Sequence, residues 1–162
     1  MKRRSSLQFI GALLACALLP VMTVGAGKGN VVERPFKAHG YTVIRLDLTP
    51  VLLGESLEAP WTIVEEVGFG THTGRWTSSG SGTYNVVTEA MASSGTMTVA
   101  SGDVIEWDSP QSGLVNFTAG TGRFANGSGT LVQNMTVISE VAEGPYYLLI
   151  TVEWTASGTI AY

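Results

Sequence analysis

The sequence predicts an all-β domain and favours a small closed barrel. Three observations carry this prediction. Apolar and polar residues alternate in several segments, and no long segment repeats with the 3.6-residue period of a helix. Short turns rich in glycine and proline separate the alternating segments at regular intervals. Several short strands with this spacing are typical of barrels and sandwiches, and both architectures remain open at this point.

The clearest strand is the last one, over residues 146–162. Its even-numbered positions are apolar or small, and its odd-numbered positions from Thr151 onward are threonine, serine or glutamate. This alternation gives the segment one apolar and one polar face. A strand of this length is typical of a barrel, and Gly158 predicts a bend in it.

Seven further strands are predicted earlier in the chain. In residues 41–48, Thr42, Ile44 and Leu46 share one face. In residues 61–69, the alternation predicts that Trp61 and Phe69 share one face. The remaining candidates are residues 71–84, 96–100, 104–107, 114–118 and 129–138.

Residues 1–26 are predicted to be a secretory signal peptide. Three basic residues follow Met1, residues 7–24 are almost wholly apolar, and small residues precede the expected cleavage site at Ala26. Pro20 interrupts the apolar stretch, which is short for a helix that must cross the bilayer. We therefore expect a secreted or periplasmic protein without stable membrane insertion, cleaved near Ala26.

Cys16 offers a second interpretation of the N-terminus. It follows Leu13-Leu14-Ala15, which loosely resembles the lipid-attachment motif of bacterial lipoproteins. We favour a plain apolar residue inside the signal peptide, because Leu14 fits that motif poorly. Cleavage after Ala26 then leaves a chain without cysteine, so neither a disulfide nor thiol catalysis is expected.

The mature chain, residues 27–162, is predicted to be one acidic domain. Cleavage removes three basic residues and no acidic ones, which leaves six basic against thirteen acidic residues and a net charge of −7. Nucleic-acid binding is not expected, because it needs clustered positive charge. Two separated histidines do not predict a metal site. No helix can follow the glycines of residues 120–125, so no dinucleotide cofactor is expected.

Four segments of the mature chain resemble one known group of proteins. They are Arg-Pro-Phe-Lys at residues 34–37, Gly-Thr-His-Thr-Gly-Arg-Trp-Thr at 70–77, Gly-Thr-Gly-Arg-Phe-Ala-Asn-Gly-Ser-Gly-Thr at 120–130 and Gly-Thr-Ile-Ala-Tyr at 158–162. In these segments the chain resembles secreted bacterial members of the allene oxide cyclase-like group of β-barrel proteins, a group that also includes dirigent-like proteins. The shared segments are turns and strands, so they bear on the fold more than on the chemistry.

The resemblance implies a closed antiparallel barrel of eight strands with a central cavity. Plant allene oxide cyclases, dirigent proteins and bacterial spirocyclases use this scaffold to hold a hydrophobic substrate and steer its cyclisation or coupling. None of the plant enzymes' catalytic residues has a match in this chain, so no catalytic residue is carried over. Members of the group often form dimers or trimers, so the resemblance also implies a homodimer or homotrimer.

Glu65 is a candidate acid or base. It lies at the same parity as Trp61 and Ile63, so an inward face would make it a buried carboxylate with a raised pKa. The alternative is a slip in strand register at Glu65 and Glu66 that leaves both side chains in solvent. We favour the slip.

His72 is a second candidate acid or base. It shares the strand parity of Trp76 and could line a cavity mouth. Its surroundings are rich in glycine, so we favour a hydrogen bond that stabilises a turn. Arg75 and Arg123 occupy equivalent positions in a weak internal repeat, and we expect them to pair with carboxylates rather than bind an anion.

Four tryptophans complete the predicted ligand site. Trp61, Trp76, Trp107 and Trp154 could line an apolar pocket or simply fill the interior of the barrel. We expect a barrel that binds a small hydrophobic molecule without assigned catalysis. The alternatives are a cyclase or isomerase that works on such a molecule, and a small outer-membrane barrel, which the alternation of residues 146–162 also fits.

Overall fold

The computed structural model describes residues 32–162 as eight strands and two short helical turns. The predicted signal peptide, its cleavage site at Ala26 and Cys16 lie outside the described residues. The strands are β1 (Glu33–Asp47), β2 (Glu58–Gly70), β3 (Gly74–Asn85), β4 (Met91–Val99), β5 (Val104–Gln111), β6 (Leu114–Gly120), β7 (Ser128–Glu143) and β8 (Tyr147–Ala161). The helical turns are α1 (Thr49–Leu52) between β1 and β2 and the 3-10 turn η1 (Gly122–Phe124) between β6 and β7.

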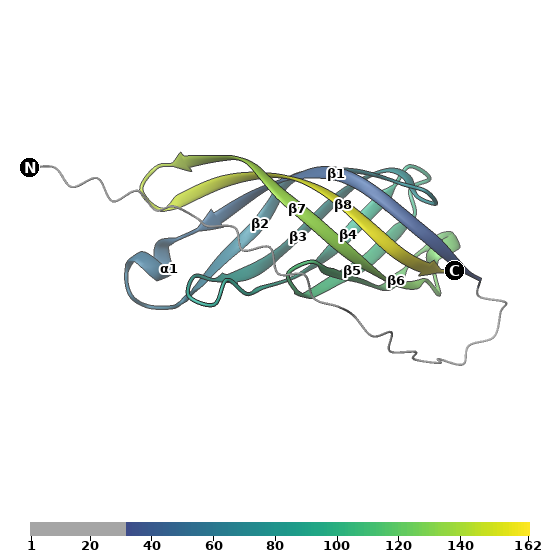
Figure 1. Cartoon of the computed structure of the whole chain (residues 1–162), viewed down its shortest axis with the longest axis horizontal. Helices are drawn as coiled ribbons and strands as arrows, with labels where there is room; N and C mark the ends of the chain where they lie inside the picture. The colour runs from purple at the N-terminus through teal and green to yellow at the C-terminus, as the bar shows by residue number, and fades with distance from the viewer. Residues whose placement is uncertain (1–31) are drawn as a thin grey trace, which may run out of the picture.

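The strands form a closed barrel in which each is antiparallel to its neighbours in the sequence. β1 closes it by pairing with β8 along its whole length, from Glu33 opposite Ala161 to Asp47 opposite Tyr147. All eight predicted strands are present, and the closed barrel rather than the sandwich is confirmed. Both chain ends of the barrel lie at one end of the molecule, here called the terminal end (Figure 1). The β1–β2, β3–β4, β5–β6 and β7–β8 connections lie at the opposite end, here called the hairpin end.

Apolar residues face the interior and polar residues face outward, as the alternation predicts. In β8, Val152, Trp154 and Ile160 are buried, whereas Glu153 and Thr155 between them are exposed. The interior is therefore an apolar core of the kind that stabilises a barrel in water.

The core has two clusters, one toward each end. The terminal-end cluster contains Phe36, Trp76, Phe117, Phe124, Trp154 and Ile160 among its buried members. The hairpin-end cluster contains Ile44, Leu46, Ala59, Trp61 and Val152.

Each of the four tryptophans stands directly opposite a glycine on a neighbouring strand. The pairs are Trp61 with Gly82, Trp76 with Gly68, Trp107 with Gly95 and Trp154 with Gly40. A Cβ atom added at any of these glycines would lie 2.9 Å or less from an atom of the opposite indole ring. The interior of an eight-stranded barrel is just wide enough for side chains to fill, so an indole ring needs an empty position facing it.

The barrel wall is split at the hairpin end between β6 and β7. β6 pairs with β7 only from Phe117 opposite Gly129 to Leu114 opposite Val132, and a last backbone bond runs from the Gln133 N–H to the Gly113 carbonyl at 2.8 Å. Beyond Gln133, β7 pairs with β8 alone. The β7–β8 hairpin therefore projects past the β5–β6 hairpin (Figure 1). At this split, here called the lateral opening, no strand pairs with β7 beyond Gln133 on the side away from β8.

The Trp76–Gly68 pair yields a test of the packing constraint. Gly68→Ala should lower the free energy of unfolding by about 2–3 kcal/mol, because the added Cβ would lie 2.7 Å from Trp76 Nε1 and force the ring to move. Urea denaturation measures the change. Thr77→Ala, on the outer face beside Trp76, is the control and should change stability by about 0.5 kcal/mol or less.

The same measurement in a Trp76→Phe background separates the ring from other causes. A smaller ring leaves room for the new methyl group, so the cost of Gly68→Ala should shrink there. An undiminished cost would show that the indole is not the obstacle.

Candidate functional site

The direction of the side chains in β2 changes at a bulge. The register of β2 against β1 shifts by one residue at Val64, which has no partner on β1. Before the bulge, Trp61 points inward and is 5% exposed. After it, Glu66 lines the interior, while Glu65 is exposed and Phe69 is 44% exposed. One extra residue in a strand thus turns every later side chain to the opposite face.

This bulge corrects the sequence prediction for residues 61–69. The prediction that Phe69 shares the inward face of Trp61 is wrong, and so is the inward position of Glu65. The Glu65 carboxylate accepts a hydrogen bond from the Tyr41 hydroxyl on the outer surface. The favoured alternative, a register slip, is confirmed. That alternative also placed the side chains of both glutamates in solvent. This is correct for Glu65 but not for Glu66, whose side chain is half-buried in the barrel.

An inner cavity of about 100 Å³ lies between the two core clusters. All four tryptophans line it, together with Glu66 and Thr42. Glu66 is the one residue among those lining the inner cavity that has an ionisable side chain. The structure therefore brings the predicted tryptophans together around a carboxyl group that the sequence analysis did not select.

A chain of hydrogen bonds fixes the Glu66 carboxyl. The Trp154 Nε1–H donates to Thr42 Oγ1 at 2.9 Å, and the Thr42 hydroxyl donates to Glu66 Oε2 at 3.0 Å. Thr42 is buried, so its hydroxyl has these two partners in place of water. The chain links β8, β1 and β2 across the wall and orients Glu66 toward the cavity.

Burial raises the pKa of the Glu66 carboxyl above its ordinary value of 4.5. The hydrogen bond from Thr42 and the nearby Trp76 indole act in the lowering direction, and burial outweighs both. An apolar enclosure without a nearby cation disfavours the charged carboxylate. The site thus holds a carboxyl group that keeps its proton to a higher pH than one in water.

Two indole N–H groups of the inner cavity have no hydrogen-bond partner. Trp107 donates to Ser78 Oγ at 3.1 Å and Trp154 donates to Thr42, but Trp61 Nε1 and Trp76 Nε1 are buried and donate to no acceptor in residues 32–162. An unpaired buried donor is costly, so such groups are uncommon in folded proteins.

An outer cavity of about 200 Å³ adjoins the inner one toward the hairpin end. The two share Ile44, Trp61 and Met135 in their linings. Met135 and Val137 of β7 point toward the interior yet are 38% and 53% exposed, because no strand covers them beyond the split. The outer cavity is therefore an apolar passage from the lateral opening to the inner cavity.

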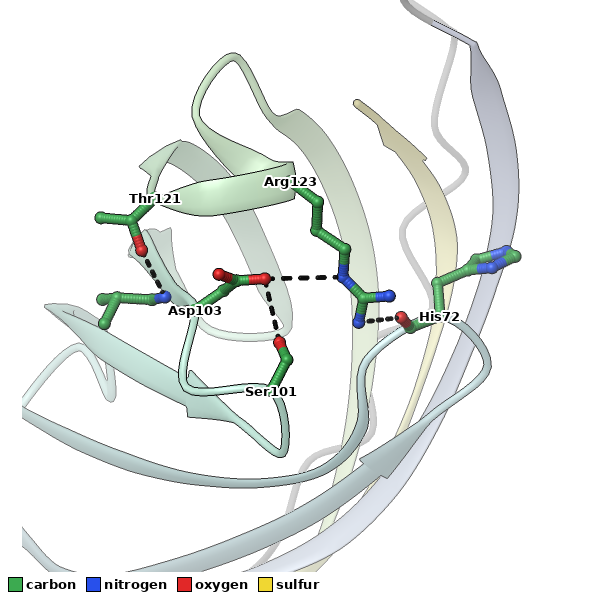
Figure 2. A network of polar contacts seen from close by, with 6 residues as sticks. His72, Ser101, Asp103, Thr121 and Arg123 are labelled. Carbon is green, nitrogen blue, oxygen red and sulfur yellow. Dashed lines mark hydrogen bonds and ion pairs between the residues drawn. The ribbon is translucent and has the colours of Figure 1, made fainter.

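His72 lies outside both cavities. Its Nε2 is 2.9 Å from the Pro35 carbonyl oxygen, and its own carbonyl accepts a hydrogen bond from Arg123 Nη2 at 2.8 Å. Figure 2 shows this contact within a network in which Arg123 Nε lies 3.8 Å from Asp103 Oδ2 and the Ser101 hydroxyl donates to the same oxygen. His72 thus makes a side-chain hydrogen bond that joins the turn between β2 and β3 to β1, and its favoured role in stabilising that turn stays a prediction.

The two arginines of the internal repeat differ in their surroundings. Arg123 pairs with the carboxylate of Asp103, as expected. Arg75 is the second residue of β3 and is exposed, whereas Arg123 lies in η1, so the repeat does not place the two in the same structure. Among residues 32–162, no ion pair of Arg75 is found. The prediction of a carboxylate partner is therefore supported for Arg123 alone.

Comparison with known proteins gives no family. No family model matches the chain, and no curated protein matches its sequence.

In the described part of the chain, His, Asp and Glu side chains form no group of three or more that could hold a metal ion. None of the helices within residues 32–162 has the length and apolar character needed to cross a membrane.

A change of parity in the sequence is the signal that could have identified Glu66. Inward positions are odd-numbered up to Ile63 and even-numbered from Glu66 to Gly68. Glycines at inward positions opposite tryptophans would have marked the new parity, since Gly68 stands opposite Trp76. That change of parity implies one inserted residue between Ile63 and Glu66.

The raised pKa of Glu66 predicts a pH-dependent stability difference. The folded state holds the proton more tightly than the unfolded chain, so this contribution is complete below pH 4.5 and is lost as the pH rises through the folded-state pKa. Glu66→Gln lacks this titration. Its free energy of unfolding relative to wild type should rise with pH by about 1.4 kcal/mol for each unit of pKa elevation, then stay constant.

Urea denaturation between pH 3 and pH 8, in steps of about half a unit, measures this difference. Glu65→Gln removes an exposed carboxylate from the adjacent position and is the matched control. A Glu66→Gln difference that does not change with pH would show that the carboxyl titrates as it does in water.

Proposed function

We propose that the barrel binds a small, mainly apolar molecule in the inner cavity and admits it through the lateral opening. The observation that carries the proposal is an internal cavity beside a split in the wall. Ligand sites of small molecules are concave and mostly apolar, with a few placed polar groups. The inner cavity has this character, with four tryptophans around one carboxyl group.

The dimensions favour a ligand with about one ring. An apolar cavity of roughly 150 Å³ can take up benzene. The inner cavity of about 100 Å³ is smaller, but the adjoining outer cavity of about 200 Å³ extends it toward the opening. A ring with a short substituent fits across both.

Export remains part of the proposal. It rests on the basic and apolar pattern of residues 1–26 and on the expected cleavage near Ala26. Kinship with the allene oxide cyclase-like group rests on the four segments that resemble it and on the eight-stranded barrel, which suits that group. Assembly as a homodimer or homotrimer stays a prediction.

Glu66 supports a second candidate function, an isomerase or cyclase. A half-buried carboxyl group with a raised pKa can donate a proton to a bound molecule and take one back at a higher pH than a carboxyl group in water. Such an enzyme would hold its substrate as the binding protein does. Turnover that Glu66→Gln slows by about 10²–10⁴ would distinguish the enzyme from the binding protein.

The outer-membrane barrel fits the described residues less well. A barrel in lipid needs an apolar outer band. The outward positions of β3 are Thr77, Ser79, Ser81 and Thr83, and those of β8 include Glu153. The apolar faces of these strands point inward to the core instead.

Filling the cavity tests the proposed binding site. Ser93 of β4 lines the inner cavity, and its neighbour Ser94 is exposed on the outer face. Ser93→Leu should weaken the binding of a single-ring hydrocarbon such as ethylbenzene about tenfold or more, because the leucine occupies the ligand's space. Isothermal titration calorimetry measures the affinity.

Ser94→Leu is the matched control, since it adds the same side chain outside the barrel. It should bind ethylbenzene as the wild type does. Equal loss in both variants, or no uptake of hydrocarbon by the wild type, would contradict the cavity as the binding site.

A further inference from the structure

The polar groups around Glu66 have more hydrogen-bond donors than acceptors. The Thr42 hydroxyl uses its proton on Glu66 and its oxygen on Trp154, so Thr42 is satisfied. The Trp61 and Trp76 indoles are donors alone, and each lacks an acceptor among the described residues. The wall of the inner cavity thus has unused donors.

Trp76 places one of these donors beside Glu66. Its Nε1 edge lies over Gly68, two residues beyond Glu66 on β2, and its N–H is near enough to the Glu66 carboxyl to lower the carboxyl's pKa, although the two groups do not have the geometry of a hydrogen bond. A Cβ at residue 68 would lie 2.7 Å from this nitrogen, so the glycine gives the N–H the room to stand there. Glu66 and Trp76 therefore form one polar group in a wall whose other polar side chains are the hydroxyls of Thr42, Ser78, Ser93, Ser109 and Ser112 and the amide of Gln133.

A neutral Glu66 adds a further donor at this point. Burial raises the pKa of the carboxyl group and so favours its protonated form, and one carboxyl oxygen already accepts the Thr42 hydrogen bond. The carboxylic O–H has no acceptor among the hydrogen bonds of the described side chains. Two adjacent donors without an acceptor are complementary to one oxygen atom with two lone pairs.

We propose that the inner cavity selects neutral, apolar molecules that carry one hydrogen-bond-accepting oxygen, such as an aryl ketone, and that Glu66 and Trp76 donate to this oxygen. The inference rests on the proposed binding function and names the chemical class of its ligand. It also assigns Glu66 a binding role that the four tryptophans alone would not supply. A hydrocarbon of the same shape leaves both donors unpaired.

The inference makes ligand binding depend on pH through Glu66, the one ionisable side chain that lines the inner cavity. Tyr41, Arg45, Glu65 and Arg75 on β1, β2 and β3 do not line either cavity, and the titratable groups that line the adjoining outer cavity are Tyr84 and Glu140. No charged group contributes to the pKa of Glu66, which burial, Thr42 and Trp76 set. Ionisation would remove the O–H donor and place a negative charge against the ligand's oxygen.

The test compares acetophenone with isopropenylbenzene, which has the same shape but a CH₂ group in place of the carbonyl oxygen. Titration calorimetry on the purified protein between pH 4 and pH 9, about one unit apart, gives both affinities. Acetophenone should bind about tenfold more tightly at low pH, the value of one net hydrogen bond. This preference should decline as the pH rises through the raised pKa, while the affinity for isopropenylbenzene stays constant.

Two variants assign the effect to Glu66. Glu66→Gln keeps a neutral N–H donor at the same place, so it should prefer acetophenone at every pH. Glu66→Leu leaves the Trp76 N–H as the one remaining donor of the pair, so its preference for acetophenone should be smaller than that of Glu66→Gln and independent of pH. If Glu66→Leu does not fold, as judged by circular dichroism, the pH profile of Glu66→Gln against wild type decides.

The outcomes separate this inference from the binding function. Equal affinity of the wild type for both compounds would overturn the ligand class and leave the cavity as a site for apolar molecules. A preference for acetophenone that grows with pH would overturn it as well, since Glu66 would then act in its charged form. Failure of both compounds to bind would overturn the binding function too.

Discussion

The pairing of each large indole with a glycine on the next strand is the constraint on which the rest of this barrel depends. An eight-stranded barrel has little room in its interior. A tryptophan would therefore collide with a side chain of ordinary size at the position that faces it on the next strand. Opposite Trp154, the position of Gly40 leaves no space for a Cβ between the ring and the β2 backbone. The rings therefore lie flat against bare backbone and fill the barrel from the wall inward, and the small void they leave becomes the inner cavity. The packing of the tryptophans and the cavity proposed as the binding site therefore have the same cause.

The β2 bulge decides what that void can do chemically. If residues 61–66 alternated without a bulge, Glu65 would occupy the inward parity and Glu66 would face solvent. The bulge instead brings Glu66 under the Trp154–Thr42 hydrogen bond, so that a group from β2 is held by groups from β8 and β1. Bulges often re-aim a side chain beside a functional site. Here a single inserted residue determines both the identity and the environment of the carboxyl.

Alternation along the chain was enough to predict the strands and most of the core, because apolar inward residues and polar outward residues alternate with period two in a half-buried strand. Residues 146–162 show this best, and Trp154 and Ile160 are buried as expected. The tryptophans of the cavity followed from size and polarity. Glu66 did not, because the parity changes within residues 64–66, where the apolar residue Val64 is exposed and does not mark the inward face. The split between β6 and β7 could not be predicted from the sequence either, since it depends on the unequal lengths of paired strands and not on composition.

The split has a mechanical consequence. A closed barrel resists local opening because each strand is held on both sides, but β7 beyond Gln133 is held by β8 alone. Stability is unevenly distributed in such a molecule, because local opening is easier for the part of β7 beyond Gln133 than for a strand held on both sides, whereas β8 is held by β1 as far as Tyr147. β7 can part from β8 there without breaking any bond of the β1–β8 seam. Access to the interior is thereby separated from the energy that holds the barrel closed.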